Sequence, residues 1–211
     1  MGLLEGGVGP RLCFFTGDAF ARVLRFARTL ERPEPMDSRD FDLRYPIGPH
    51  TLPATVARAD LNAWVAELAA LPQNLRNAVE GMRDDELDTP YRPGGWTARQ
   101  VVHHIADGHM SAYTRFRLAL TEETPTVKPF EETLWAELLD AKTGPIEPSL
   151  ALVDGLHQRW VMLLQSMSDA DFKRRYRHPD RGELIPLEAT LSYFAWHARH
   201  HVAQILRVRN R

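Results

Sequence analysis

The chain has 211 residues, 44% of them hydrophobic and 26% charged, and a formal net charge of −2 at pH 7. These proportions are typical of a globular protein and exclude a disordered or fibrous chain. The near-neutral charge gives no electrostatic reason to expect a nucleic-acid partner, and no apolar run reaches the roughly 18 residues that a membrane-spanning helix needs.

Residues 1–35 are expected to be a disordered extension or the product of an over-long start, because they begin glycine-rich and end at Pro33 and Pro35. The folded domain is then expected to span 36–211. Cys13 is the single cysteine, so an internal disulfide is excluded and a metal site in the domain must use nitrogen and oxygen ligands. The absence of disulfides fits a reducing compartment, and we expect a cytoplasmic protein.

Apolar residues recur at three- and four-residue steps over about 57–82 and predict a first long amphipathic helix. Pro72 falls inside this segment and predicts a kink or a break near Leu71. A second long helix is predicted from Ala98 to about residue 120, because Thr97 and Gln100 form a capping box at its start.

A short helix is expected at 133–139 between two loops, and Ser149 is expected to cap a third long helix. The segment 168–186 reads as a charged connection with a short helix at 169–176, and Pro186 suits the first turn of a last long helix. No strand alternation is found. The predicted fold class is all-α, a four-helix bundle with long connecting loops, and the length of those loops indicates extra structure or function in them.

Histidines interrupt the apolar stripes of two of these helices. His197 and His201 stand one turn apart on the last helix, the spacing at which two imidazoles can share one metal ion. His104 lies in the stripe of the second helix, and Gly108 one turn later leaves room for a bound group. Burying an unpaired polar group costs on the order of 1–3 kcal/mol, whereas one divalent ion accepts lone pairs from all three rings. The sequence therefore predicts a metal site, and the alternative is three neutral rings with separate hydrogen bonds.

The remaining histidines of the domain carry weaker signals. His103 and His200 flank proposed ligands and are expected near the site or at the surface. His109, His157 and His178 are expected to be structural, hydrogen-bonded or solvent-facing residues.

Several segments resemble the YfiT branch of the DinB-like superfamily, among them LDTPYRPGGWTARQVVHHIADGHM (87–110), LHQRW (156–160) and WHARHHVAQI (196–205). The resemblance covers essentially all of 45–208. Members of the branch are generally labelled metal-dependent hydrolases, and some related proteins are thiol S-transferases that use bacillithiol. The resemblance implies a four-helix bundle, a homodimer and one Zn²⁺ or Ni²⁺ per subunit, with His104, His197 and His201 as the ligands. Gln204 stands where relatives often carry another histidine.

Three neutral imidazoles leave a coordination position open, which is the layout of a catalytic site. Zinc lowers the pKa of bound water to about 7 and deprotonates a bound thiol, so the ligand set allows a hydrolase or a thiol transferase acting on a small electrophile. We favour thiol transfer, because no glutamate is placed like the general base of an H-E-x-x-H motif.

Two further residues are candidate catalytic groups. Asp107 could orient a ligand ring or accept a proton, and Arg159, like Arg115, could bind an anionic substrate. A third reading is a non-catalytic, stress-related metal-binding protein. A fourth ligand such as Asp107 would favour that reading, because structural zinc sites are normally closed by four protein ligands.

Overall fold

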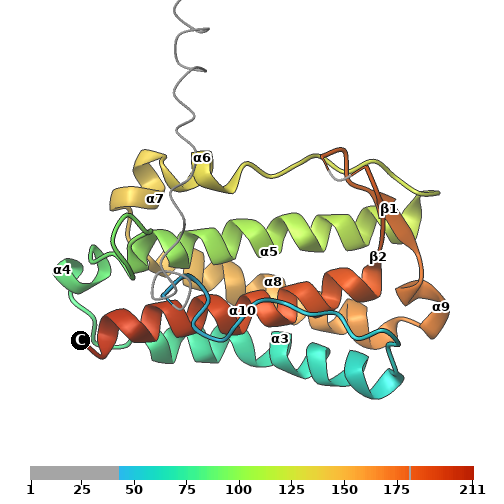
Figure 1. Ribbon diagram of the computed structural model, residues 1–211, viewed down its shortest axis with the longest axis horizontal. Coiled ribbons are helices and arrows are strands. Elements are labelled where there is room, and N and C mark those ends of the chain that lie inside the picture. Colours follow the sequence, from blue (N-terminus) through green and yellow to red (C-terminus); the bar gives the residue numbers. More distant parts are fainter. Residues whose placement is uncertain (1–42, 181) are drawn as a thin grey trace, which may run out of the picture. The chain divides into compact units, whose positions relative to one another are not determined.

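Four long helices form the bundle: α3 (Arg58–Val79), α5 (Ala98–Thr121), α8 (Glu147–Ser166) and α10 (Leu187–Arg209) (Figure 1). The computed structural model describes residues 43–180 and 182–211, all within one unit of the chain, Ser38–Arg211. Over these residues the predicted all-α bundle is confirmed. The prediction for residues 1–35 lies outside the described residues.

The order of the helices in the bundle differs from their order in the sequence. Both α3 and α5 pack against α8 and α10, so the consecutive helices α3 and α5 lie diagonally opposite each other, and so do α8 and α10. A simple up-and-down bundle instead places consecutive helices side by side and joins them with short loops. The diagonal arrangement requires the long connections at 80–97 and 167–186. Its consequence for the site is that α5 and α10, distant in sequence, become neighbours.

Helix starts follow local sequence closely. At the start of α5, the Gln100 N–H donates to Thr97 Oγ1 (3.1 Å) and the Thr97 N–H donates to Gln100 Oε1 (2.9 Å), which confirms the predicted capping box. Helix α8 begins at Glu147, earlier than the predicted cap at Ser149. The reason is Pro148, which fits the first turn of a helix, where its missing N–H costs nothing.

Helix α3 continues through Pro72, so of the predicted kink or break near Leu71 the break was wrong. A proline has no N–H, and the carbonyl four residues earlier, that of Leu68, therefore lacks its usual partner within the helix. That carbonyl accepts a hydrogen bond from His157 Nδ1 on α8, at 2.7 Å. A side chain of a neighbouring helix thus satisfies the group that the proline leaves open.

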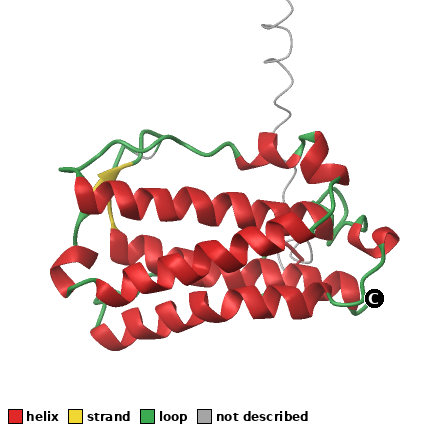
Figure 2. Ribbon diagram, turned by 180° about the vertical axis from the view of Figure 1, so that it is seen from behind, coloured by secondary structure: helices red, strands yellow, loops and turns green. Residues whose placement is uncertain are grey.

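The connections contain short helices and one small sheet (Figure 2). The helices are α4 (Asp84–Leu87), α6 (Glu132–Ala136), α7 (Leu139–Thr143) and α9 (Asp169–Phe172), and the strands are β1 (Arg175–Arg177) and β2 (Leu184–Pro186), paired antiparallel. Helix α9 confirms the first half of the helix predicted over 169–176, and β1 replaces its end. Helix α7 occupies a segment predicted as loop. Strands of three residues are too short to show the alternation by which strands are recognised.

Aromatic and leucine side chains fill the interior, with Trp160, Phe116, Phe172 and Tyr176 among the largest fully buried ones. The segment ahead of α3, which includes residues 44–50, follows the outside of α10. Trp196 Nε1 donates to the Gly48 carbonyl at 3.0 Å, and Gln204 Nε2 donates to the Arg44 carbonyl at 3.1 Å. No helix in the described ranges is both long and apolar enough to cross a membrane.

Candidate metal centre

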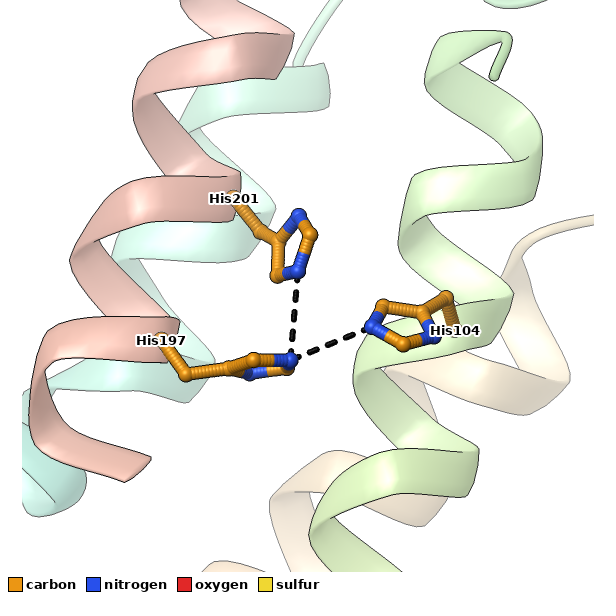
Figure 3. Close-up of side chains that lie close together, drawn as sticks. All are labelled: His104, His197 and His201. Carbon is orange, nitrogen blue, oxygen red and sulfur yellow. Dashed lines mark hydrogen bonds between the residues drawn. The ribbon is translucent and has the colours of Figure 1, made fainter. Parts of the chain in front are cut away.

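Three histidines from two neighbouring helices point at one another (Figure 3). His104 comes from α5, and His197 and His201 come from α10. The Nε2 atom of His197 lies 3.1 Å from that of His104 and 3.1 Å from that of His201. One ring nitrogen of each lies within 4.8 Å of the other two. The structure therefore brings together the three residues that helical periodicity selected.

All three rings are buried, and burial keeps them neutral. Burial, with a smaller contribution from nearby His200, lowers the pKa of His104 to about 4. Burial, followed by the neighbouring imidazoles, holds the pKa values of His197 and His201 well below the ordinary 6.5. A neutral imidazole has a lone pair to give to a metal ion, and an imidazolium has none. At pH 7 the cluster is therefore in its metal-binding form.

Gln204 fixes which nitrogen of His201 carries hydrogen. The amide nitrogen of Gln204 donates to the Arg44 carbonyl at 3.1 Å and to His200 Nε2 at 2.9 Å, which turns its Oε1 toward His201 Nδ1 at 2.8 Å. An amide oxygen only accepts, so His201 carries its hydrogen on Nδ1 and its lone pair on Nε2. That lone pair faces the centre of the cluster.

The spacing of the three rings fits a first-row divalent ion. Zinc–imidazole bonds of about 2.0–2.1 Å at tetrahedral angles place ligand nitrogens roughly 3.3 Å apart, close to the two separations of 3.1 Å found here. Imidazole ligands suit zinc, nickel, copper and iron. No carboxylate or cysteine of the described residues joins the three histidines as a further candidate ligand.

A cavity of about 480 Å³ opens onto the histidines, and aromatic side chains line much of it, including Trp96, Phe130, Tyr193 and Trp196. The ring centroid of Trp96 lies 4.6 Å from that of His104, so Trp96 both packs on a candidate ligand and lines the cavity. Gly108 supplies the room expected from the sequence. A β-carbon there would lie 3.7 Å from His197 Cε1 and 3.9 Å from His104 Cε1, so a larger side chain would occupy the space beside both rings.

The other candidate residues lie in different places. Arg115 lines the cavity, and its buried Nε has no hydrogen-bond partner among the described residues. Arg159 is exposed and lies over the ring of Tyr113, 5.8 Å from its centroid. Asp107 lines a neighbouring groove, where burial and then the charge of Asp140 raise its pKa to about 6. The structure thus brings Arg115 to the cavity, and it places Arg159 and Asp107 outside the residues that line it.

His109 and His157 are structural, hydrogen-bonded residues, as expected, but the sequence did not predict that they adjoin the histidine cluster. Both are buried, and His109 Nε2 lies 3.1 Å from His197 Nδ1. A signal for His157 was present, because it follows Val153 by four residues and precedes Trp160 by three, in the apolar stripe of α8.

A four-helix bundle that directs three neutral imidazoles into one cavity is built as a metal-binding protein. The chain belongs to the DinB superfamily, whose family profile matches residues 67–205.

Relatives agree with that assignment. The chain is 48% identical over 170 residues to "Putative metal-dependent hydrolase YfiT" of Bacillus subtilis, covering 81% of this chain and 96% of the relative. It is 48% identical over 169 residues to a "Putative metal-dependent hydrolase" of Geobacillus thermodenitrificans, covering 80% of this chain and 95% of that relative. The solved structure of Bacillus subtilis YfiT, described as having "an unusual four-helix bundle topology", matches with a TM-score of 0.78 at 47% identity, over 80% of this chain and 97% of that one.

Proposed function

We propose that this protein is a metal-dependent enzyme in which His104, His197 and His201 hold one zinc or nickel ion, and that it transfers a low-molecular-weight thiol of the bacillithiol type to a small electrophile. The observation that carries the proposal is the set of three buried, neutral imidazoles whose Nε2 atoms meet at 3.1 Å beside a cavity of about 480 Å³. An ion in this position supplies Lewis acidity, which lowers the pKa of a bound thiol or water. Three protein ligands favour a catalytic site over a closed structural one.

The side chains around the cavity suggest the kind of substrate. Trp96, Phe130 and Trp196 present apolar ring faces, which bind the apolar body of an electrophile and displace water from it. The guanidinium of Arg115 lines the same cavity and can bind an anionic substituent or stabilise a departing anion. A halogenated or otherwise activated aromatic compound combines these properties.

The surroundings of the site favour a thiol as the nucleophile. Within the described chain, the buried titratable groups beside the three histidines are two further imidazoles, those of His109 and His200. His109 is hydrogen-bonded to His157, and His200 to Gln204. Attack by water gains from a general base beside the ion, whereas an ion such as zinc deprotonates a bound thiol outright. Thiol transfer therefore does not need the general base that hydrolysis would need beside the ion.

Hydrolysis is the second candidate. Glu132 lines the cavity and offers a carboxylate that could accept a proton from an attacking water. The names of the relatives point the same way. The non-catalytic, stress-related metal-binding protein is the third, and it requires an ion to be bound without turnover.

The test uses metal-free protein reloaded with Zn²⁺ or Ni²⁺ and incubated with 1-chloro-2,4-dinitrobenzene and a small thiol. In thiol transfer a carbon–sulfur bond forms as the carbon–chlorine bond breaks, chloride leaves, and the thiol proton passes to solvent. We expect the thioether above the uncatalysed background only in reloaded samples, and background alone for His197→Ala. Dinitrophenol as the product would favour hydrolysis. Equal thioether rates in chelated and reloaded samples would reject the transferase, and a bound ion without either product would favour the third candidate.

The oligomeric state is a separate prediction. We propose a homodimer, in keeping with the resemblance described above. Exposed apolar side chains that a subunit contact could cover lie on α6, on α7 and between them: Leu134, Leu139 and Leu138. Light scattering at micromolar concentration should give twice the chain mass, and a monomer across the concentration range would reject the dimer.

A further inference from the structure

A continuous chain of buried imidazoles leads from the metal centre across the bundle. His197 Nδ1 lies 3.1 Å from His109 Nε2, His109 Nδ1 lies 3.0 Å from His157 Nε2, and His157 Nδ1 lies 2.7 Å from the Leu68 carbonyl oxygen. These four residues belong to α10, α5, α8 and α3, so the chain touches every long helix. His109 is 0% and His157 1% exposed, which shields both rings from competition by solvent. We call this series the histidine relay.

The far end of the relay fixes its direction. The Leu68 carbonyl has no partner within α3, because residue 72, which would donate to it, is a proline. A carbonyl oxygen can only accept a hydrogen bond, so His157 must carry its hydrogen on Nδ1. By leaving the Leu68 carbonyl without a donor, Pro72 therefore fixes the tautomer of His157, and this tautomer in turn constrains His109.

Each following ring is determined by the one before it. With its hydrogen on Nδ1, neutral His157 has a lone pair on Nε2, and His109 must donate to it from Nδ1. The lone pair of His109 is then on Nε2, and His197 must donate to that atom from its own Nδ1. His197 is left with a lone pair on Nε2, the atom that faces His104 and His201. The opposite direction would aim a lone pair of His157 at the lone pairs of the Leu68 oxygen.

We propose that His109 and His157 are positioning residues that hold His197 in its Nδ1–H tautomer and so present its Nε2 lone pair to the metal ion. Gln204 does the same for His201 by a separate route. The inference rests on the proposed metal site but is independent of the reaction that the ion supports. The relay ends at a carbonyl that cannot release a proton, so it holds a tautomer and does not conduct protons.

The relay has a consequence for the lone pairs of the histidine cluster. The Nε2 atoms of His197 and His201 lie 3.1 Å apart, and both carry lone pairs, so no hydrogen bond joins them. Lone pairs at that distance repel each other, and a shared cation turns the repulsion into two coordinate bonds. Hydrogen-bonded donation at Nδ1 also raises the basicity of Nε2, which strengthens metal binding.

The first test measures tautomers in the wild-type, metal-free protein. Two-bond ¹H–¹⁵N correlation spectra at pH 7.5 distinguish the protonated nitrogen of each neutral imidazole. We expect His157, His109 and His197 to be Nδ1–H tautomers. An Nε2–H tautomer at His109 or His197 would overturn the proposal. The measurement needs no bound ion, so it stands even if the proposed enzymatic function fails.

The second test breaks the relay at a ring that does not touch the ion. His157→Leu removes both nitrogens, and we expect a 10- to 100-fold weaker zinc affinity, roughly the range for lost partners of metal ligands, with a mixture of tautomers at His197. His157→Gln keeps one donor and one acceptor and should recover part of the affinity. His103→Leu is the matched control, because His103 Nδ1 bonds Ser149 Oγ at 2.8 Å, outside the relay, and its zinc affinity should stay within about twofold of wild type.

Variants are compared under conditions where circular dichroism shows the native helix content. Unchanged zinc affinity and an unchanged His197 tautomer in folded His157→Leu would overturn the proposal. If neither His157 variant folds, the wild-type spectra decide the question alone.

Discussion

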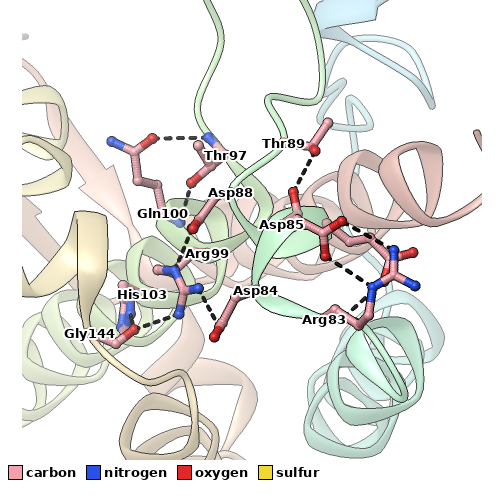
Figure 4. Close-up of polar contacts among 11 residues, drawn as sticks. Arg83, Asp84, Asp85, Asp88, Thr89, Thr97, Arg99, Gln100, His103 and Gly144 are labelled. Carbon is pink, nitrogen blue, oxygen red and sulfur yellow. Dashed lines mark hydrogen bonds and ion pairs between the residues drawn. The ribbon is translucent and has the colours of Figure 1, made fainter.

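Two buried polar clusters lie only about one turn apart on α5, and they are completed in different ways. The first surrounds Arg99, which is 5% exposed. Its guanidinium donates to Asp88 at 2.7 Å, to Asp84 at 2.8 Å and to the Gly144 carbonyl at 2.9 Å (Figure 4). Every partner belongs to the chain itself. These bonds tie the connections around α4 and α7 to the start of α5.

The second cluster surrounds His104, which is 8% exposed. Its Nε2 faces the Nε2 atoms of two other histidines, and its Nδ1 has no partner among the described residues. The Nε2 lone pairs of His197 and His201, 3.1 Å apart, face each other and cannot satisfy one another. A buried polar cluster whose groups all find partners within the chain supports the fold, whereas one with lone pairs that face each other is arranged for a ligand from outside.

The largest effect is expected when one histidine of the cluster is replaced. His197→Ala or His201→Ala should lower metal content from about one ion per chain to less than a tenth, because two remaining ligands hold a divalent ion more than about 100-fold more weakly. Elemental analysis after dialysis measures this. Arg99→Met, prepared alongside, should keep its metal. Full metal content in either histidine variant would show that the cluster is not the site.

The second-largest effect is expected from acid, which should destabilise the histidine cluster because that cluster depends on neutral rings. Burial lowers the pKa of His157 and of His104 to about 4, below the ordinary 6.5. The unfolded chain therefore binds protons first, and stability that is complete above pH 6.5 is lost as pH falls toward 4.

The metal-free protein should lose at least about 2 kcal/mol between pH 7.5 and 5, the contribution of one ring that is protonated in the unfolded chain and neutral in the folded one. Urea denaturation at pH 7.5, 6 and 5 measures the loss. Saturating zinc should move the acid transition to lower pH, since the ion competes with protons for the same lone pairs. A stability that does not change between pH 7.5 and 5 would contradict the assignment of neutral buried rings.

A smaller effect on stability is expected in the Arg99 cluster, whose groups find their partners within the chain. Arg99→Met should lower the free energy of unfolding by about 1–3 kcal/mol, because it removes three hydrogen bonds of a buried cation while its two carboxylate partners can be hydrated. Thermal denaturation of the metal-free form measures it. If this variant lost its metal as completely as His197→Ala, the two clusters would not be independent.

The smallest effect concerns Asp107, on the same helix but outside both clusters. Its folded pKa of about 6 lies above the usual 3.8, so the charged carboxylate destabilises the native state once pH exceeds about 4, and fully above 6. Asp107→Asn should therefore gain about 1 kcal/mol at pH 7.5, after allowance for solvent screening, and less at pH 5. A loss of stability at pH 7.5, or a loss of metal, would instead indicate that the carboxylate contributes to the site.

Local sequence was sufficient for a large part of this protein. The capping box of Thr97 and Gln100 placed the start of α5, because its two hydrogen bonds join residues three apart. Helical periodicity likewise selected His104, His197 and His201, because residues four apart on a helix share a face whatever the helix packs against. The fold class and the three candidate metal ligands could therefore be predicted before any packing was known.

Only the tertiary structure decided which residues contact those candidate ligands. The diagonal order of the helices set α5 beside α10, and it placed His109, His157 and the Leu68 carbonyl in one line, although the bonds of this line join residues 88, 48 and 89 positions apart. It also placed Arg115 in the cavity and Arg159 at the surface. Contacts between distant segments depend on how whole helices pack, and a pattern within one helix carries no information about the neighbour that it faces.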